Sequence, residues 1–148
     1  NTASKVVYFA TILHAQSLKV AALLDSDAAG DQAAKQETLV HTLGQKRILR
    51  TKDFATGTVD KPEVEDLLRF TLPKIAKAEL GWDLGTAIDD NPQVSLAKLY
   101  ERGVPEFSKY RLAKAFMRWC RENEANDLDP AEREGWSKLF AGISSALK

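Results

Sequence analysis

The sequence predicts an α/β fold in which helices flank a parallel sheet and an all-helical C-terminal part follows. Before residue 51, patterns typical of helix, strand, helix and strand alternate, which is the order that a parallel α/β sheet produces. After residue 51, only helical patterns occur. We therefore expect an α/β core over residues 1–70 and a helical region over residues 71–148 that completes the domain.

The clearest strand is the apolar run from Val20 to Leu24, which ends abruptly at Asp25. A short, uninterrupted apolar run bounded by polar turn residues is typical of a strand buried on both faces of a parallel sheet. A second, shorter candidate follows some twenty residues later. We expect strands at 19–24 and 45–50 to pair in parallel within one sheet.

The remaining segments have helical patterns. Apolar residues recur at helical spacing before residue 14 and again from about 31 to 43, where Gly44 is a suitable C-terminal cap. Asp60 and Glu63 have the spacing of a capping box, so a helix is expected to begin at Asp60 and to end near Pro73. Further helices are expected at 73–80, 92–102, 105–125 and from 129 onward.

Asp25 and Asp27 follow the first strand at alternate positions, so their side chains point the same way in an extended backbone. Ligands of open parallel sheets collect at the carboxyl ends of the strands, where this pair lies. Neighbouring carboxylates repel each other unless a cation or a shared proton relieves them, and oxygen ligands suit Mg²⁺ or Mn²⁺. The pair therefore predicts a metal site. The alternative is a helix cap, in which Asp27 or Asp31 accepts hydrogen bonds from the first amides of the next helix.

Several other chemistries are disfavoured by the sequence. It has no Gly-rich phosphate loop of Walker type, no Gly-x-Ser-x-Gly elbow and no Cys/His cluster for zinc. Its two histidines are far apart, which disfavours a Ser-His-Asp triad. The carboxylates and lysines that remain are typical of metal-dependent phosphoryl transfer or phosphodiester hydrolysis.

Charge is balanced over the chain but unevenly distributed. Because 21 basic residues match 21 acidic ones, the net charge points to no partner. A basic stripe without any acid between residues 109 and 121 could bind phosphates or pair with acidic segments. The stripe consists of Lys109, Arg111, Lys114, Arg118 and Arg121. The helix expected from Asp60 has an acidic start, which suits its dipole.

Cysteine usage and hydropathy bear on the compartment. The one cysteine, Cys120, excludes an internal disulfide framework and fits a reducing compartment. No apolar run approaches the length of a membrane span, and the start lacks the pattern of a signal peptide. We therefore expect a cytoplasmic protein without a membrane partner.

Residues 23–30, Leu-Leu-Asp-Ser-Asp-Ala-Ala-Gly, resemble the Asp-x-Asp motif of Toprim domains, the metal-binding fold of topoisomerases, primases and certain nucleases. The wider context is similar to the OLD (overcoming lysogenisation defect) family, whose members join an N-terminal ABC-type ATPase to a C-terminal Toprim nuclease. Residues 63–68 resemble the acidic segment of that family, and residues 107–113 resemble the segment with its functional lysine. The resemblance runs from the first helix to about residue 120 and implies a Toprim-like sheet.

The resemblance also implies a metal-dependent DNA endonuclease that hydrolyses phosphodiesters with two Mg²⁺ or Mn²⁺ ions. Asp25 and Asp27 would bind these ions together with Glu65 or Asp66, and Lys109 would be the catalytic lysine that offsets charge on the phosphate. The Lys109 ammonium is therefore expected within ~10 Å of the Asp25 or Asp27 carboxylate. DNA would be bound through its backbone. An upstream ATPase domain of the same polypeptide, and a homodimer formed through it, are further expectations.

One departure from the family concerns the first strand. Toprim domains place a glutamate at the end of that strand, and no strand pattern precedes the first helix here. We expect the missing strand to lie upstream of Asn1, so that this fragment alone could be inactive. Two alternatives stay open. A haloacid-dehalogenase-type phosphatase also ends a strand in Asp-x-Asp, but it needs Thr or Val where this chain has Ala29. A degenerate Toprim domain or a receiver-like pocket would be a non-enzymatic structural or interaction module.

Overall fold

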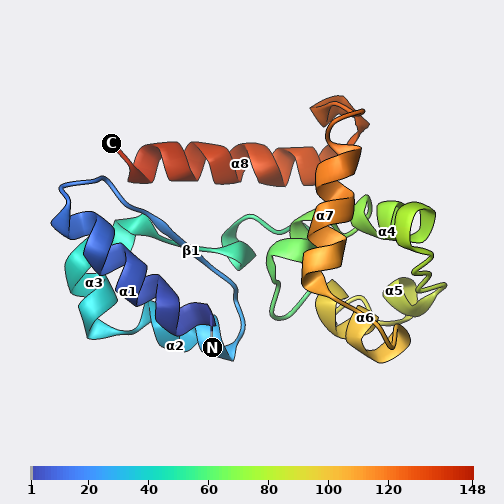
Figure 1. Ribbon diagram of the computed structural model, residues 1–148, viewed down its shortest axis with the longest axis horizontal. Coiled ribbons are helices and arrows are strands. Elements are labelled where there is room, and N and C mark those ends of the chain that lie inside the picture. The colour runs from blue at the N-terminus through green and yellow to red at the C-terminus, as the bar shows by residue number, and fades with distance from the viewer. Residues whose placement is uncertain (1) are drawn as a thin grey trace. The chain divides into compact units, whose positions relative to one another are not determined.

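The computed structural model describes the backbone of residues 2–148 and the side chains from residue 5 onward. The chain divides into two compact units, and each is described by itself below (Figure 1). The first unit comprises Asn1–Phe54 and Trp136–Lys148, and the second comprises Ala55–Gly135. The boundary expected after residue 70 lies within the second unit. In the described residues, no helix is both long and apolar enough to cross a membrane.

The first unit contains a two-stranded parallel sheet. Strand β1 (Ala22–Leu24) pairs with β2 (Ile48–Arg50), with Leu23 opposite Leu49. The prediction of two parallel strands in one sheet is thus confirmed, although both strands are shorter than expected. In the part of the chain that the structure describes, no strand follows β2, which confirms the predicted all-helical continuation.

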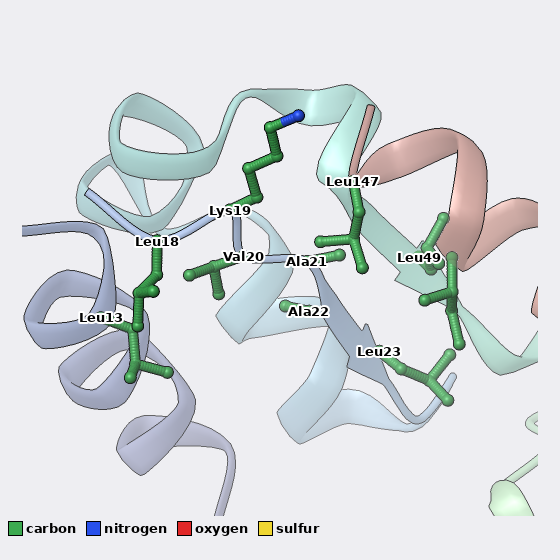
Figure 2. Close-up of a pocket in the computed structure, with 10 residues that line it drawn as sticks. Leu13, Leu18, Lys19, Val20, Ala21, Ala22, Leu23, Leu49 and Leu147 are labelled. Carbon is green, nitrogen blue, oxygen red and sulfur yellow. The ribbon is translucent and has the colours of Figure 1, made fainter. Parts of the chain in front are cut away.

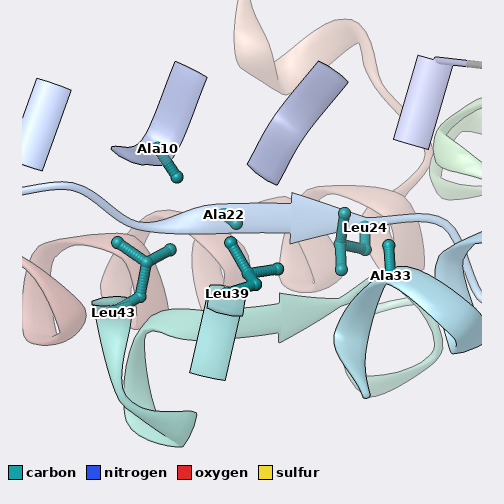
Figure 3. Packing of buried hydrophobic residues seen from close by; sticks show 6 residues of the cluster. All are labelled: Ala10, Ala22, Leu24, Ala33, Leu39 and Leu43. Atoms are coloured by element: carbon teal, nitrogen blue, oxygen red, sulfur yellow. The ribbon is translucent and has the colours of Figure 1, made fainter. Parts of the chain in front are cut away.

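Three helices pack on one face of this sheet. Helix α1 (Thr2–Ala15) precedes β1, and α2 (Ala28–Ala34) and α3 (Glu37–Leu43) lie between the strands in sequence. Alternation along β1 turns two side chains toward these helices. Figure 3 shows the resulting core, which consists of Ala10, Ala22, Leu24, Ala33, Leu39 and Leu43.

The segment expected to form one helix from 31 to 43 forms two. Helix α2 ends at Ala34, and Gln36 adopts an extended backbone before α3 begins. At 3.6 residues per turn, Ala33 and Leu39 would point about 120° apart on a single straight helix. The break rotates α3 so that both side chains are buried in the same core.

The first unit also includes most of the last helix, α8 (Pro130–Ala146), which confirms the helix expected from residue 129. A Cβ at Gly142 would lie 3.2 Å from the ring of Phe54, so the helix and this ring are in close contact. The guanidinium of Arg47 donates a hydrogen bond of 3.1 Å to the carbonyl of Ala146. A cation at the C-terminal end of a helix complements the helix dipole.

The second unit is helical. It consists of α4 (Leu72–Leu80), α5 (Ala87–Asp90), α6 (Leu96–Gly103) and α7 (Lys109–Trp119), and the last of these packs on α4. Helix α7 is shorter than the expected 105–125. The ring of Tyr100 is buried and stacks on Phe107, with the Trp82 ring at an angle to both.

Short 3₁₀ helices occur in both units. They lie at Gln45–Arg47 and Thr51–Asp53 in the first unit and at Val64–Leu68 and Ala125–Asp127 in the second.

The prediction of a helix that begins at Asp60 is wrong in the position and in the type of the helix. The backbone amide of Asp60 bonds the carbonyl of Gln93, and the helix that follows is the 3₁₀ helix Val64–Leu68. Its capping box lies three residues later than predicted, with Glu63 as the N-cap and Asp66 as the reciprocal partner. The spacing rule selected the wrong acid because Glu63 itself can cap.

Candidate functional site

The turn between β1 and α2 holds the two aspartates predicted to bind metal. Asp25 follows the last residue of β1, and Asp27 is the N-cap of α2; both side chains are half-buried. One carboxylate oxygen of Asp27 accepts a hydrogen bond of 2.7 Å from the amide of Gly30. The helix-cap alternative is therefore confirmed for Asp27. A cap uses a single oxygen, so the second oxygen is still suited to bind a cation.

Helix α2 approaches the end of β1 closely at Gly30. A Cβ built at this residue would lie 1.9 Å from the carbonyl oxygen of Asp25, a backbone atom that cannot move aside without shifting the strand end. A glycine is therefore required here for steric reasons. It lets the N-terminus of α2 lie directly against the Asp25 carbonyl.

We expect Gly30→Ala to destabilise the protein by about 3 kcal/mol, because the added methyl group forces the helix and the strand end apart. Chemical denaturation monitored by circular dichroism measures this loss. Gly57→Ala is not a suitable control because Gly57 has a positive φ of 114°. Gln32→Ala, at an exposed position of the same helix, should change stability by less than about 0.5 kcal/mol. Equal stability of Gly30→Ala and the parent protein would contradict the close approach.

Arg50, at the end of β2, was not predicted to belong to the site. Its guanidinium donates hydrogen bonds to the carbonyls of Asp25 (2.8 Å) and Gly30 (3.1 Å) and forms an ion pair of 2.5 Å with Asp31. The hydrogen bond from Arg50 lowers the pKa of Asp31. Its position follows from the register of the sheet, which places Arg50 opposite Leu24, the residue before Asp25. A cation held here reduces the repulsion between the neighbouring carboxylates.

A second link joins the ends of the two strands. The hydroxyl of Thr51 accepts a hydrogen bond from the Ser26 amide (3.0 Å) and donates one to the Ser26 hydroxyl (3.1 Å). The Lys52 amide donates to the same Ser26 hydroxyl. Ser26 and Thr51 are buried, so these bonds are shielded from water and fix the turn that carries Asp25 and Asp27.

The other predicted site residues lie in the second unit. Lys109, the first residue of α7, forms ion pairs with Glu63 and with Glu65, the latter at 3.5 Å. The hydroxyl of Ser95 donates a hydrogen bond of 2.8 Å to Glu63. A cation at a helix N-terminus is disfavoured by the dipole, and acidic neighbours offset this cost. Two such neighbours are found.

Asp66 has a structural environment. Its side chain is only 1% exposed, and burial raises its pKa although three hydrogen bonds act in the opposite direction. One oxygen accepts from Arg69 and from the Leu96 amide, and the other accepts from the Glu63 amide. Both oxygens are thus engaged, and Asp66 would have to give up these bonds to bind a cation. The Asp66 carboxylate therefore does not fit the role of a metal ligand.

The predicted site residues are therefore divided between the two units. Asp25 and Asp27 share a turn of the first unit, whereas Glu65, Asp66 and Lys109 lie together in the second. Their assembly into one metal site, and the expected approach of Lys109 to the aspartates, stay predictions. In the described part of the chain, no group of three or more His, Cys, Asp or Glu side chains is arranged to hold a metal ion. Mg²⁺ requires fewer, because it is commonly bound by one or two carboxylates together with substrate phosphates and water.

The basic stripe on α7 is partly neutralised. In addition to Lys109, Arg118 forms an ion pair of 2.7 Å with Glu79, and Arg111 lies 3.6 Å from Glu106. The Arg111 guanidinium also lies over the ring of Trp82. Three of the five cations thus pair with acids, which is the second of the two roles that the sequence left open. The stripe is a weaker phosphate-binding surface than its composition suggests.

No protein-family model matches the sequence, and no curated protein or solved structure is significantly similar to it. The turn after β1 brings together two carboxylates, buried hydrogen bonds between Ser26 and Thr51, and Arg50 at the carboxyl end of a parallel strand.

Proposed function

We propose that this chain is part of a divalent-metal-dependent DNA endonuclease and that Asp25 and Asp27 bind the metal. The observation that carries the proposal is the position of both carboxylates immediately after β1, at the carboxyl end of a parallel sheet. Carboxylate oxygens are the ligands that Mg²⁺ and Mn²⁺ prefer. The local structure favours this use, because Arg50 and the bonds between Ser26 and Thr51 hold the turn in one conformation.

Each residue has a distinct role in this proposal. Asp25 and Asp27 hold the cation, and Arg50 positions Asp25 through its carbonyl without touching the substrate. Glu65 would contribute a further carboxylate, and the Lys109 ammonium would offset negative charge on the phosphate. When bound, the two ions supply Lewis-acid activation of the phosphodiester. Asp66, by contrast, is better described as a structural residue.

DNA is the proposed substrate, held through its phosphate backbone, so binding should weaken with salt. The context proposed is a larger ATPase-nuclease of the OLD type, in which an upstream domain binds ATP and forms the homodimer. These finer statements rest on the resemblance of residues 23–30 to the Toprim motif. The proposed compartment is the cytoplasm.

A second candidate function is a non-enzymatic module of Toprim-like or receiver-like design. Two observations favour it: Asp27 caps α2, and Asp66 is fully used by its hydrogen bonds within the unit. In this case the acids that follow β1 serve the local fold alone. The two candidates make opposite predictions for substitutions that keep the cap and change the charge.

We expect Asp25→Asn and Asp27→Asn each to reduce Mg²⁺- or Mn²⁺-dependent cleavage of plasmid DNA by more than about a hundredfold in the full-length protein. The reason is that an amide keeps the size of the side chain and removes the charge that holds the cation. Asparagine is as good an N-cap as aspartate, so Asp27→Asn should leave α2 intact. Cleavage of supercoiled plasmid, followed on agarose gels at matched protein concentrations, measures the effect.

Matched variants separate the two candidates. Asp89→Asn, at an exposed position of α5, is the charge control and should cut DNA at the parental rate. Asp27→Ala should in addition lower stability by about 1 kcal/mol through loss of the cap. If Asp25→Asn and Asp27→Asn cut as fast as the parent, the metal assignment is wrong and the structural module is favoured.

A further inference from the structure

One face of the small sheet in the first unit is only partly covered. On β1, Ala22 and Leu24 are buried beneath α1, α2 and α3, whereas Leu23, on the opposite face, is half-buried. Leu49 of β2 faces the same side as Leu23 and is also half-buried. Parallel strands are normally covered on both faces. This face is therefore suited to receive further apolar groups.

A hollow of about 370 Å³ lies over this face, beside the C-terminal end of α8. Figure 2 shows Leu13 and Leu18 on one side and Leu23, Leu49 and Leu147 on the other, with residues 20–22 between them. Leu13 and Leu18, on the same side of the hollow, are 40% and 52% exposed, so this side presents apolar surface to solvent. We call this surface the apolar groove.

One cation lies in the groove and three more line a neighbouring hollow. Lys19 lines the groove, and a second hollow on the other side of the last turn of α8, which shares Leu49, is lined by Lys46, Arg47 and Lys148. Among the described residues that line either hollow there is no aspartate or glutamate, and none of these four cations pairs with an aspartate or glutamate of the described chain. Arg47 donates its hydrogen bond to the main-chain carbonyl of Ala146, which leaves the charge of Arg47 in place, and Lys19 donates one of 3.2 Å to the main-chain oxygen of Lys148. We call these cations the basic rim.

We propose that the apolar groove and the basic rim bind an acidic, amphipathic helical segment of a protein partner. Aliphatic side chains of the segment would enter the groove, and its carboxylates would pair with the basic rim. The concave form supports a peptide, because a lipid surface instead takes up apolar side chains that protrude. This inference uses a different part of the first unit from Asp25 and Asp27 and is independent of the proposed nuclease function.

The test uses the 148-residue chain and two synthetic, fluorescently labelled peptides of about 16 residues, long enough for helical structure to form. Both carry leucine at helical spacing; one has glutamate at the flanking positions and the other has lysine. We expect the glutamate peptide to bind at least about tenfold more tightly, and its affinity to fall with salt. Fluorescence anisotropy measures both affinities. Equal binding of the two peptides, or no binding of either, would overturn the proposal.

Variants locate the binding surface. Leu18→Glu and Lys46→Glu, both at exposed positions, should each weaken binding of the glutamate peptide about tenfold. Lys46→Glu should also improve binding of the lysine peptide, which simple loss of structure cannot do. Lys61→Glu, an exposed charge reversal in the second unit, is the control and should change neither affinity. Unchanged binding of the glutamate peptide by Leu18→Glu and Lys46→Glu would contradict the assignment. So would a parent protein that binds vesicles containing phosphatidylserine but not the glutamate peptide.

Discussion

Asp66→Ala is expected to lower the free energy of unfolding by about 3–5 kcal/mol, the cost typical of leaving one member of a buried ion pair alone. Arg69 is 6% exposed and would keep its charge without the carboxylate that it now contacts at 3.1 Å. The amides of Glu63 and Leu96 would lose their acceptor as well. Urea denaturation followed by circular dichroism measures the loss.

Asp66→Asn tests the same site by charge alone. The amide keeps an acceptor for part of the network, so its cost should be smaller than that of Asp66→Ala. Asp89→Ala, an exposed acid of the same unit, should change stability by less than about 0.5 kcal/mol. A loss of similar size in Asp66→Ala and Asp89→Ala would show that the buried network contributes little.

Burial also gives Asp66 a defined effect on pH dependence. Since its pKa is higher in the folded than in the unfolded protein, the folded state binds a proton more readily, and stability falls as the pH rises from the ordinary pKa of 3.8 through the raised value. Asp66→Asn removes this titration. Its stability, relative to that of the parent, should therefore improve as the pH rises through this window.

The first unit was largely predictable because its signals are local. The apolar run before Asp25 marks β1, and a parallel partner followed from the alternation of elements. The division between α2 and α3 was not predicted, because apolar residues occur throughout 31–43 and only the burial of both Ala33 and Leu39 in one core shows that a single straight helix does not suffice. The role of Arg50 depends on strand register, which single-residue patterns do not encode.

The second unit was harder to predict because its acidic side chains bond to residues that are far away in the sequence. Glu63 was expected inside a helix and is instead an N-cap that also pairs with Lys109, 46 residues later. The acids at 63–66 resembled a metal-binding segment, yet a carboxylate that binds metal and one that holds buried amides have the same sequence appearance. Burial and hydrogen-bond partners distinguish the two, and for Asp66 they indicate the structural role.

Glu132 is a further case, and its substitution is expected to have the second large effect. Asp129 and Glu132 have the spacing of a capping box at the start of α8, and Asp129 does accept a hydrogen bond from the Ala131 amide there. The Glu132 carboxylate, however, is 1% exposed and accepts from the amides of Phe70 (2.5 Å) and Thr71 (3.1 Å). It thereby binds the chain at the N-terminal end of α4 rather than its own helix.

We expect Glu132→Ala to cost about 3 kcal/mol, because it leaves two main-chain donors and the Thr71 hydroxyl without their charged acceptor. Glu101→Ala, an exposed position of α6, is the matched control. A double-mutant cycle with Thr71→Val isolates the contact, since the two substitutions should be less than additive if the carboxylate and the hydroxyl interact. Additive losses would mean that the carboxylate does not interact with the Thr71 hydroxyl, and a negligible loss in Glu132→Ala would show that the N-terminal end of α4 does not depend on this carboxylate.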